Sequence, residues 1–436
     1  MARIDPELVR TVNDRVRDAT DQRTSDVFAA CFADTLSTTL SDQPDGSLFM
    51  VTGDIPAMWL RDSTAQLAPY LHFAADDPHL AETIARISRR QLAFITLDPY
   101  ANAFNASPSS AGHSTDLTEL SPWVWERKYE VDSLCFPTQL AHDLWSITGR
   151  TDHLEADFRA AAGAAIALWR REQHHEADSS YRFQRLDGPP SDTLRRDGRG
   201  ELVAPTGLTW SAFRPSDDAC EYGYNIPGNA FAAVELGHIE QIARQVFNDE
   251  VLAAQARELR ADIEEGIRRH GIVQGPSGEQ IYGYEVDGLG GVLLMDDANV
   301  PSLLSLPLVG WCDQSDPTYL ATRDFVLSAD NPYFYEGIHA RGVGSPHTPP
   351  RQVWPIALAV EGLTATDRAE KIRIIELLCA TDAGTSLMHE SFHVDDPSVF
   401  TRPWFSWANA MFCELVLDAC GLRTHDRRVM RAGGLS

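Results

Sequence analysis

Two clusters of acidic side chains lie in surroundings that favour proton transfer. In the stretch 213–220 (FRPSDDAC), Asp217 and Asp218 are adjacent and precede a segment with helical periodicity. Carboxyl groups this close repel each other's charge, which raises the pKa of at least one and suits it to general acid catalysis. In the stretch 388–393 (MHESFH), Glu390 lies between polar residues and is a candidate general base. The two aspartates also fit an acidic turn that caps a helix.

The second cluster also matches the zinc-binding pattern H-E-x-x-H. In a zinc peptidase, His389 and His393 would bind the metal and Glu390 would act as the general base. Both histidines would then need to share one face of a continuous helix. The flanking runs 383–386 (AGTS) and 395–397 (DDP) leave little room for such a helix. A zinc peptidase therefore stays an alternative, and both interpretations make Glu390 reactive.

A third segment has the composition of a sugar-binding site. The stretch 52–63 (TGDIPAMWLRDS) contains Asp54, Trp59, Arg61 and Asp62 directly before a predicted helix. An aromatic ring offers an apolar surface to the C–H face of a pyranose, while charged side chains bind its hydroxyl groups. The same segment also fits a helix-entry loop whose tryptophan packs in the core.

Clusters of acid, amide and aromatic residues recur at the ends of other helical segments. A solvated turn does not need Trp or Tyr, so this recurrence predicts the lining of a polar pocket. The further candidates for sugar binding are Tyr100, Asn102, Lys128, Glu130, Asp297, Asn299, His347, His389 and Arg402. The sequence has no glycine-rich phosphate loop after a strand and no GxSxG elbow, so dinucleotide-binding and serine-hydrolase sites lack support.

Helical periodicity dominates the segments that must position these residues. The apolar stripe from 404 to 419 predicts a helix opened by Pro403, and Asn225 is expected to cap another. Further helices are expected near residues 7–18, 64–75, 80–97, 136–148, 154–171, 247–269, 318–328 and 353–380. Short strands are expected in 47–52 and 271–284. The sequence therefore predicts a mainly helical protein.

No internal repeat, low-complexity tract or change in composition marks a domain boundary. With 436 residues and 43% hydrophobic composition, the chain can bury a large core. The simplest interpretation is one catalytic domain of paired helices over 1–436, with its core at about 25–420. Seven scattered cysteines without CxxC spacing are expected to be reduced thiols, most of them buried.

The charge of the chain limits the partners that it can bind. A formal net charge of −26 opposes association with nucleic acids and anionic membranes, and it does not affect neutral sugars. No apolar run approaches the roughly 20 residues of a membrane span, and no signal peptide is readable at the charged start of the chain. We therefore expect a cytoplasmic protein that has neither a nucleic-acid nor a membrane partner.

In their order along the chain, these motifs resemble glycoside hydrolase family 125, the exo-α-1,6-mannosidases. The resemblance rests on the stretches 52–62, 98–105, 128–130, 213–220 with 226–227, 295–299, 344–348, 388–392 and 400–405. It implies an (α/α)6 toroid, no metal or cofactor, and an inverting reaction that removes terminal α-1,6-linked mannose from α-mannoside oligosaccharides. It makes Asp217 or Asp218 the acid and Glu390 the base. The stretch 182–200 matches nothing in that family, and a noncatalytic glycan-binding protein stays a second alternative.

Overall fold

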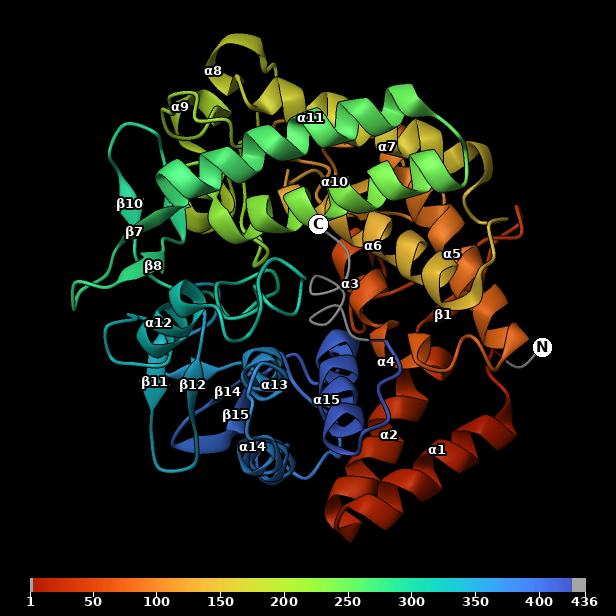
Figure 1. Ribbon diagram of the computed structural model, residues 1–436. Helices are drawn as coiled ribbons and strands as arrows, with labels where there is room; N and C mark the ends of the chain where they lie inside the picture. Colours follow the sequence, from red (N-terminus) through yellow and green to blue (C-terminus); the bar gives the residue numbers. More distant parts are fainter. Residues whose placement is uncertain (1–2, 426–436) are drawn as a thin grey trace.

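The fold consists of helices joined by long loops and short strands. The structure, a computed structural model, describes residues 3–425 (Figure 1). Its α-helices are α1 (Pro6–Ala19), α2 (Gln22–Thr38), α3 (Leu60–Ala65), α4 (Ala68–Leu71), α5 (Pro78–Leu97), α6 (Val131–Thr148), α7 (Glu155–Glu172), α8 (His175–Asp178), α9 (Arg195–Gly198), α10 (Ile226–Gln245), α11 (Glu250–Gly266), α12 (Pro317–Val326), α13 (Pro355–Leu363), α14 (Arg368–Ala380) and α15 (Ser406–Ala419). A mainly helical protein, as expected from periodicity, is confirmed.

Helices adjacent in sequence pack as pairs, and the pairs surround a common centre. Helices α10 and α11 lie side by side in one half of the molecule, and α13, α14 and α15 lie together in the opposite half (Figure 1). Helix α6 contacts α3 and α10, while α15 contacts α2 and α13. These contacts form an inner layer of helices, and α1, α5, α7, α11 and α14 pack outside it.

Burial separates the two layers. Every residue of α13 is buried, and α15 is buried along almost its whole length, as expected for helices with neighbours on all sides. Some outer helices bury only a narrow stripe, for example Val12 and Val16 of α1. One continuous hydrophobic core includes residues from Val12 to Leu422. Six of the seven cysteines are buried as free thiols, which confirms the expectation for most of them.

The residues that begin the helices differ between the layers. Four of the outer helices begin with an aspartate whose carboxylate accepts a backbone N–H, namely Asp5 for α1, Asp77 for α5, Asp249 for α11 and Asp367 for α14, whereas α7 begins at Leu154 without a side-chain cap. Four inner helices instead begin at residues whose side chains make no cap, namely Trp59 for α3, Glu130 for α6, Trp354 for α13 and Phe405 for α15. Capping residues normally stabilise the start of a helix. The absence of a side-chain cap at these four inner helices therefore suggests that their first residues serve another purpose near the common centre of the helix pairs.

Short antiparallel strands make up the rest of the regular structure. They are β1 (Leu40–Asp42), β2 (Leu48–Met50), β3 (Met58–Trp59), β4 (Ala103–Phe104), β5 (Val124–Glu126), β6 (Tyr224–Asn225), β7 (Ile272–Gln274), β8 (Gln280–Tyr282), β9 (Glu285–Val286), β10 (Val292–Leu293), β11 (Phe334–Glu336), β12 (Arg341–Val343), β13 (Gln352–Val353), β14 (Ser391–His393) and β15 (Asp396–Thr401). The β1–β2 and β7–β8 hairpins confirm the two expected strand regions.

Some predicted helices differ in extent. The segment 64–75 contains the end of α3 and the four-residue helix α4, and 353–380 is divided into α13 and α14 by the cap at Asp367. Pro403 does not open the last helix, which begins at Ser406. The backbone before Ser406 bonds outside the helix instead, because the Trp404 carbonyl accepts a hydrogen bond from the Asp54 N–H. Helix α2 was not predicted.

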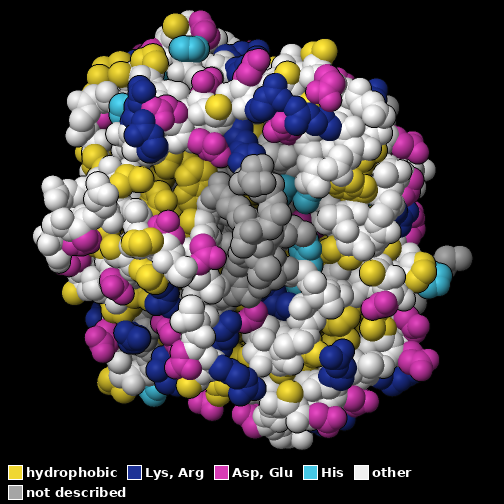
Figure 2. All heavy atoms as spheres, in the orientation of Figure 1, with side chains coloured by type: hydrophobic (Ala, Val, Ile, Leu, Met, Phe, Trp, Pro, Cys, Tyr) yellow, Lys and Arg dark blue, Asp and Glu magenta, His cyan; other side chains and the backbone are white. Residues whose placement is uncertain are grey.

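Acidic side chains are spread over the visible face of the molecule, with Lys and Arg between them (Figure 2). Within residues 3–425, no helix is both long enough and apolar enough to cross a membrane.

Candidate active site

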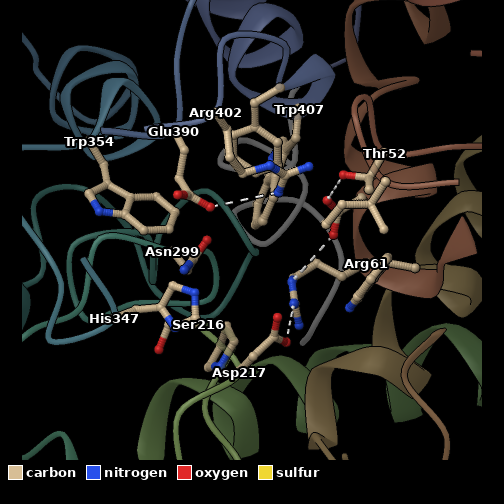
Figure 3. A pocket seen from close by; sticks show the side chains of 15 residues that line it. Thr52, Arg61, Ser216, Asp217, Asn299, His347, Trp354, Glu390, Arg402 and Trp407 are labelled. Carbon is tan, nitrogen blue, oxygen red and sulfur yellow. Dashed lines mark hydrogen bonds and ion pairs between the residues drawn. The ribbon is translucent and has the colours of Figure 1, made fainter. Parts of the chain in front are cut away.

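A pocket of about 210 Å³ lies where the starts of α3, α13 and α15 meet several loops (Figure 3). It is lined by Thr52, Ile55, Trp59, Arg61, Asp62, Pro215, Ser216, Asp217, Asn299, His347, Trp354, Glu390, Arg402, Phe405 and Trp407. Sites for drug-sized ligands usually measure roughly 300–1,000 Å³. The pocket is therefore suited to a small ligand, and its mixture of rings, amides and charges is suited to a polar one.

Two carboxylates face this pocket from different sides. Glu390 precedes β14, and Asp217 belongs to the loop before α10. Figure 3 shows the two side chains on opposite sides of the cavity, with Asn299 and His347 on the wall between them. The Glu390 Oε1 atom lies 3.7 Å from the Arg402 guanidinium, which Asp54 also binds at 2.6 Å. Arg402 is thereby held beside Glu390.

Asp217 and Asp218 point into different surroundings. Asp217 lines the pocket with its side chain 25% exposed, and its backbone has a φ of 68°. The Asp218 side chain is only 2% exposed, and its Oδ1 atom lies 3.1 Å from His347 Nδ1. Left-handed backbone is uncommon for a residue other than glycine, and here it turns the chain between the two carboxyl groups.

Four carboxyl groups surround the buried guanidinium of Arg61. It lies 2.6 Å from Glu130, 3.1 Å from Asp132, 3.1 Å from Asp217 and 3.7 Å from Asp62. One cation cannot balance four buried negative charges, so protonated carboxyls are favoured. Burial raises the pKa of Asp132 to about 6, and it also raises the pKa values of Asp62 and Glu130.

Glu130 and Asp217 share one of these protons. Burial, followed by the charge of Asp217, raises the pKa of Glu130 well above its usual range. Burial alone would raise the pKa of Asp217 as well, but the Arg61 charge and a hydrogen bond from Glu130 lower it below its usual value. Within this pair, the two pKa values therefore move in opposite directions, upward for Glu130 and downward for Asp217.

His347 carries a positive charge at neutral pH. Burial alone would lower its pKa, but the hydrogen bond and the charge of Asp218 raise the pKa of His347 to about 9. Asp217 and Glu390 add to this effect. The pocket therefore contains the cations of Arg61, His347 and Arg402 between its carboxylates.

The structure brings together most of the residues that the sequence singled out. Trp59, Arg61, Asp62, Asp217, Asn299, His347, Glu390 and Arg402 line the pocket. Others lie in a layer behind it: Asn102 and Lys128 donate to Asp217, Glu130 binds Arg61, Asp218 binds His347, and Asp297 accepts from Ser216 at 2.6 Å. Asp54 reaches the pocket only through Arg402.

Two expected sugar-binding residues lie elsewhere. The Tyr100 hydroxyl donates to Glu172 at 2.5 Å inside a buried aromatic cluster, where its ring stacks on Tyr181. The His389 ring stacks on Phe400 with 3.7 Å between ring centroids, and it is 1% exposed. Packing requirements, which the motif does not reveal, place both rings away from the pocket.

The geometry of a zinc peptidase is also absent. His393 ends strand β14, and His389 precedes that strand, so the two rings do not share a helix face. Within the described part of the chain, no group of His, Cys, Asp and Glu side chains is arranged to hold a metal ion.

Sequence reasoning missed seven residues of the lining: Thr52, Ile55, Pro215, Ser216, Trp354, Phe405 and Trp407. Thr52, Pro215 and Ser216 lie inside recognised motifs, next to the charged residues that were selected. The sequence pattern placed Trp407 in the apolar stripe of the last helix. Its ring is indeed buried, but it also lines the pocket. Trp354 and Phe405 begin inner helices without capping them, and this unusual choice of residue is the signal that would have found them.

Comparison with known proteins identifies this arrangement. Residues 21–417 match the family described as metal-independent alpha-mannosidase (GH125). The chain belongs to glycoside hydrolase family 125. A solved family 125 relative, a metal-independent α-mannosidase of Streptococcus pneumoniae in a non-productive complex with α-1,6-mannobiose, is 50% identical. Its alignment has a TM-score of 0.95 and covers 97% of this chain and all of that one.

Family 125 similarity also extends to a eukaryotic relative. The meiotically up-regulated gene 157 protein of Schizosaccharomyces pombe is 39% identical over 95% of this chain and 86% of its own length. A bacterial glucoamylase complexed with acarbose is only 13% identical, and it has a TM-score of 0.53 over 87% of this chain and 51% of its own. That likeness concerns the fold alone, which is the (α/α)6 toroid expected from the sequence.

Proposed function

We propose that the protein is an inverting exo-α-mannosidase that removes terminal α-1,6-linked mannose. The observation that carries this proposal is the placement of Asp217 and Glu390 on opposite sides of a small pocket in a family 125 chain. The α-1,6-mannobiose bound by the Streptococcus pneumoniae relative supports the linkage. A pocket with room for one sugar ring favours attack at the end of a glycan.

The two carboxyl groups have complementary roles in this reaction. Asp217 donates its proton to the glycosidic oxygen as the bond from that oxygen to the anomeric carbon breaks. Glu390 accepts a proton from a water molecule, whose oxygen bonds to the opposite face of the same carbon. Inversion needs space for this water, so acid and base carboxyls in inverting enzymes are about 6.5–9.5 Å apart.

Asp217 must receive a proton before it can act as the acid. The pKa of Glu130 is raised while that of Asp217 is lowered, and a hydrogen bond joins the two carboxyl groups. We infer that the proton moves from Glu130 to Asp217 and then to the leaving oxygen. After turnover, Glu390 releases its proton to solvent, and solvent returns one to the Glu130–Asp217 pair.

The remaining wall provides groups for the hydroxyls and the apolar face of mannose. Arg402, His347 and Asn299 can bind hydroxyl groups, and Trp354 offers an indole ring. The indole N–H groups of Trp59 and Trp407 are buried at the pocket without a hydrogen-bond partner among the described residues.

Early NMR spectra of the reaction with α-1,6-mannobiose test the proposal. We expect β-mannose as the first anomer. Initial α-mannose would overturn inversion, and absence of turnover with any α-mannoside would overturn the function. Binding without turnover would favour the noncatalytic glycan-binding alternative. The cytoplasmic location and the absence of nucleic-acid and membrane partners stay predictions from the sequence.

A further inference from the structure

The stretch 182–200, which matched no family motif, packs behind the loop that carries Asp217. It is anchored by the buried guanidinium of Arg185, which lies 2.7 Å from Asp116 and 2.7 Å from Glu126. The Arg185 side chain is 6% exposed. The same guanidinium also lies 3.5 Å from the Asp192 carboxylate. A charged group this buried, with its three acidic partners in place, fixes the position of the segment.

Lys128 connects this segment to the acid loop. Its amine donates to the Asp192 carboxylate at 2.7 Å and to the backbone carbonyl of Asp217 at 2.7 Å. The Lys128 side chain is 2% exposed. Burial alone would lower the pKa of Lys128, but the charges of Glu126, Asp217 and Asp192 raise it, so the amine stays charged.

A second contact links the segment and the loop through their backbones. The Ala219 N–H donates to the Ser191 carbonyl at 2.7 Å. Ser191 therefore contacts the loop directly at Ala219, and Asp192 is linked to it at Asp217 through the Lys128 amine. Asp217 has a backbone φ of 68°, a conformation that persists only when the surrounding contacts hold it.

We propose that Asp192 is a positioning residue for the general acid. It holds the Lys128 amine against the Asp217 carbonyl and so keeps the Asp217 carboxyl aligned with the glycosidic oxygen. Asp192 does not line the pocket. This inference rests on the proposed function, because it requires Asp217 to be the acid.

The test compares substrates that differ in their need for an acid. In Asp192→Asn, the amide keeps the side-chain shape but no longer pairs by charge with Lys128 at 2.7 Å or with Arg185 at 3.5 Å. We expect kcat on α-1,6-mannobiose to fall about 10- to 100-fold with KM little changed, and kcat on 2,4-dinitrophenyl α-mannoside to fall less than about threefold. The dinitrophenyl leaving group needs little protonation, so its turnover also shows that the variant is folded.

Asp187→Asn is the matched control, because Asp187 is an exposed aspartate of the same segment. This variant makes the same change of charge, and kcat on both substrates is expected to stay unchanged. If Asp192 acts through Lys128, the double variant D192N/K128M should lose no more mannobiose activity than K128M alone. Should D192N fail to fold, Asp192→Glu keeps the ion pair at a different length and is expected to show a smaller loss confined to mannobiose.

The inference would be overturned if D192N lost equal activity on both substrates. It would also be overturned if the losses of D192N and K128M were fully additive, or if D192N behaved like D187N. Asp217→Asn, measured in parallel, separates this failure from failure of the proposed function. If D217N is rescued selectively on the aryl mannoside and D192N is not, only the role of Asp192 is lost. If D217N shows no selective rescue, the acid itself has been assigned wrongly.

Discussion

The His347 Nδ1 atom lies 3.1 Å from the Asp218 carboxylate and joins the loop 344–348 to the loop 213–218. The contact keeps His347 positively charged in the pocket wall, and it keeps the Asp218 carboxylate directed away from the cavity. Of the two adjacent aspartates, Asp217 is the one whose carboxyl group is open to a substrate.

Replacing each aspartate by asparagine should therefore give different results. Asp217→Asn should lower kcat on α-1,6-mannobiose by about 10²–10⁴-fold, because the amide cannot protonate the leaving oxygen. Activity should be largely restored on an aryl mannoside with a good leaving group. Asp218→Asn should change kcat on both substrates to a similar degree. Selective rescue of the Asp218 variant instead would reverse the assignment.

Glu390→Gln should reduce turnover by at least about 10²–10⁴-fold on both kinds of substrate, because the amide cannot accept a proton from the attacking water. Mannoside binding, measured by calorimetry, should be largely retained, since the amide keeps the shape of the carboxylate. An active Glu390→Gln variant would place the base elsewhere, with Asp54, Asp62 and Asp297 as the remaining acidic candidates.

Glu130→Gln should shift the alkaline limb of the kcat/KM profile on mannobiose to lower pH. In the native pair, the raised pKa of Glu130 keeps one proton available as the pH rises. Glutamine cannot hold that proton, and Arg61 continues to lower the pKa of Asp217. The activated aryl mannoside serves as the control, since its profile should keep its alkaline limb. An unchanged profile on mannobiose would exclude Glu130 as the source of the proton.

The pairing of His347 with Asp218 should make stability depend on pH. The pKa of His347 rises from its ordinary 6.5 to about 9 on folding, so the stabilisation is complete below pH 6.5 and is lost as the pH rises towards 9. We therefore expect the native protein and Asp218→Asn to differ most in their free energy of unfolding at the acidic end of this pH range. Denaturant titration measures this difference. His79→Gln, at an exposed position, should show no such dependence. A difference that does not change with pH would contradict the charged state of His347.

Prolonged treatment with EDTA should leave mannosidase activity unchanged. The chemistry assigned to the pocket uses two carboxyl groups and water, and His389 and His393 lie at a strand rather than on a helix. Turnover is measured before and after dialysis against the chelator. Loss of activity that zinc restores would return both histidines to a metal site.

The sequence alone was sufficient to predict the helical class and the residue types of the site. Amphipathic stripes are local signals, so they located α1, α5 and α7 well. The same signals were weaker for α2, where Thr, Ser and Asp interrupt the apolar positions and the helix was missed. Motifs such as 52–63 and 213–220 concentrated acids, amides and rings where a solvated turn has no need of them, and this composition indicated the pocket.

Only the tertiary structure decided which of these side chains face the pocket. Asp217 and Asp218 are neighbours in sequence, and their separation depends on one left-handed backbone angle and on His347, which is 129 residues away along the chain. Tyr100 and His389 fit the motif but pack against distant rings. Lys128 joins Asp192 to Asp217 across 64 and 89 residues. Side-chain directions in irregular loops follow such non-local contacts, which periodicity and composition do not encode.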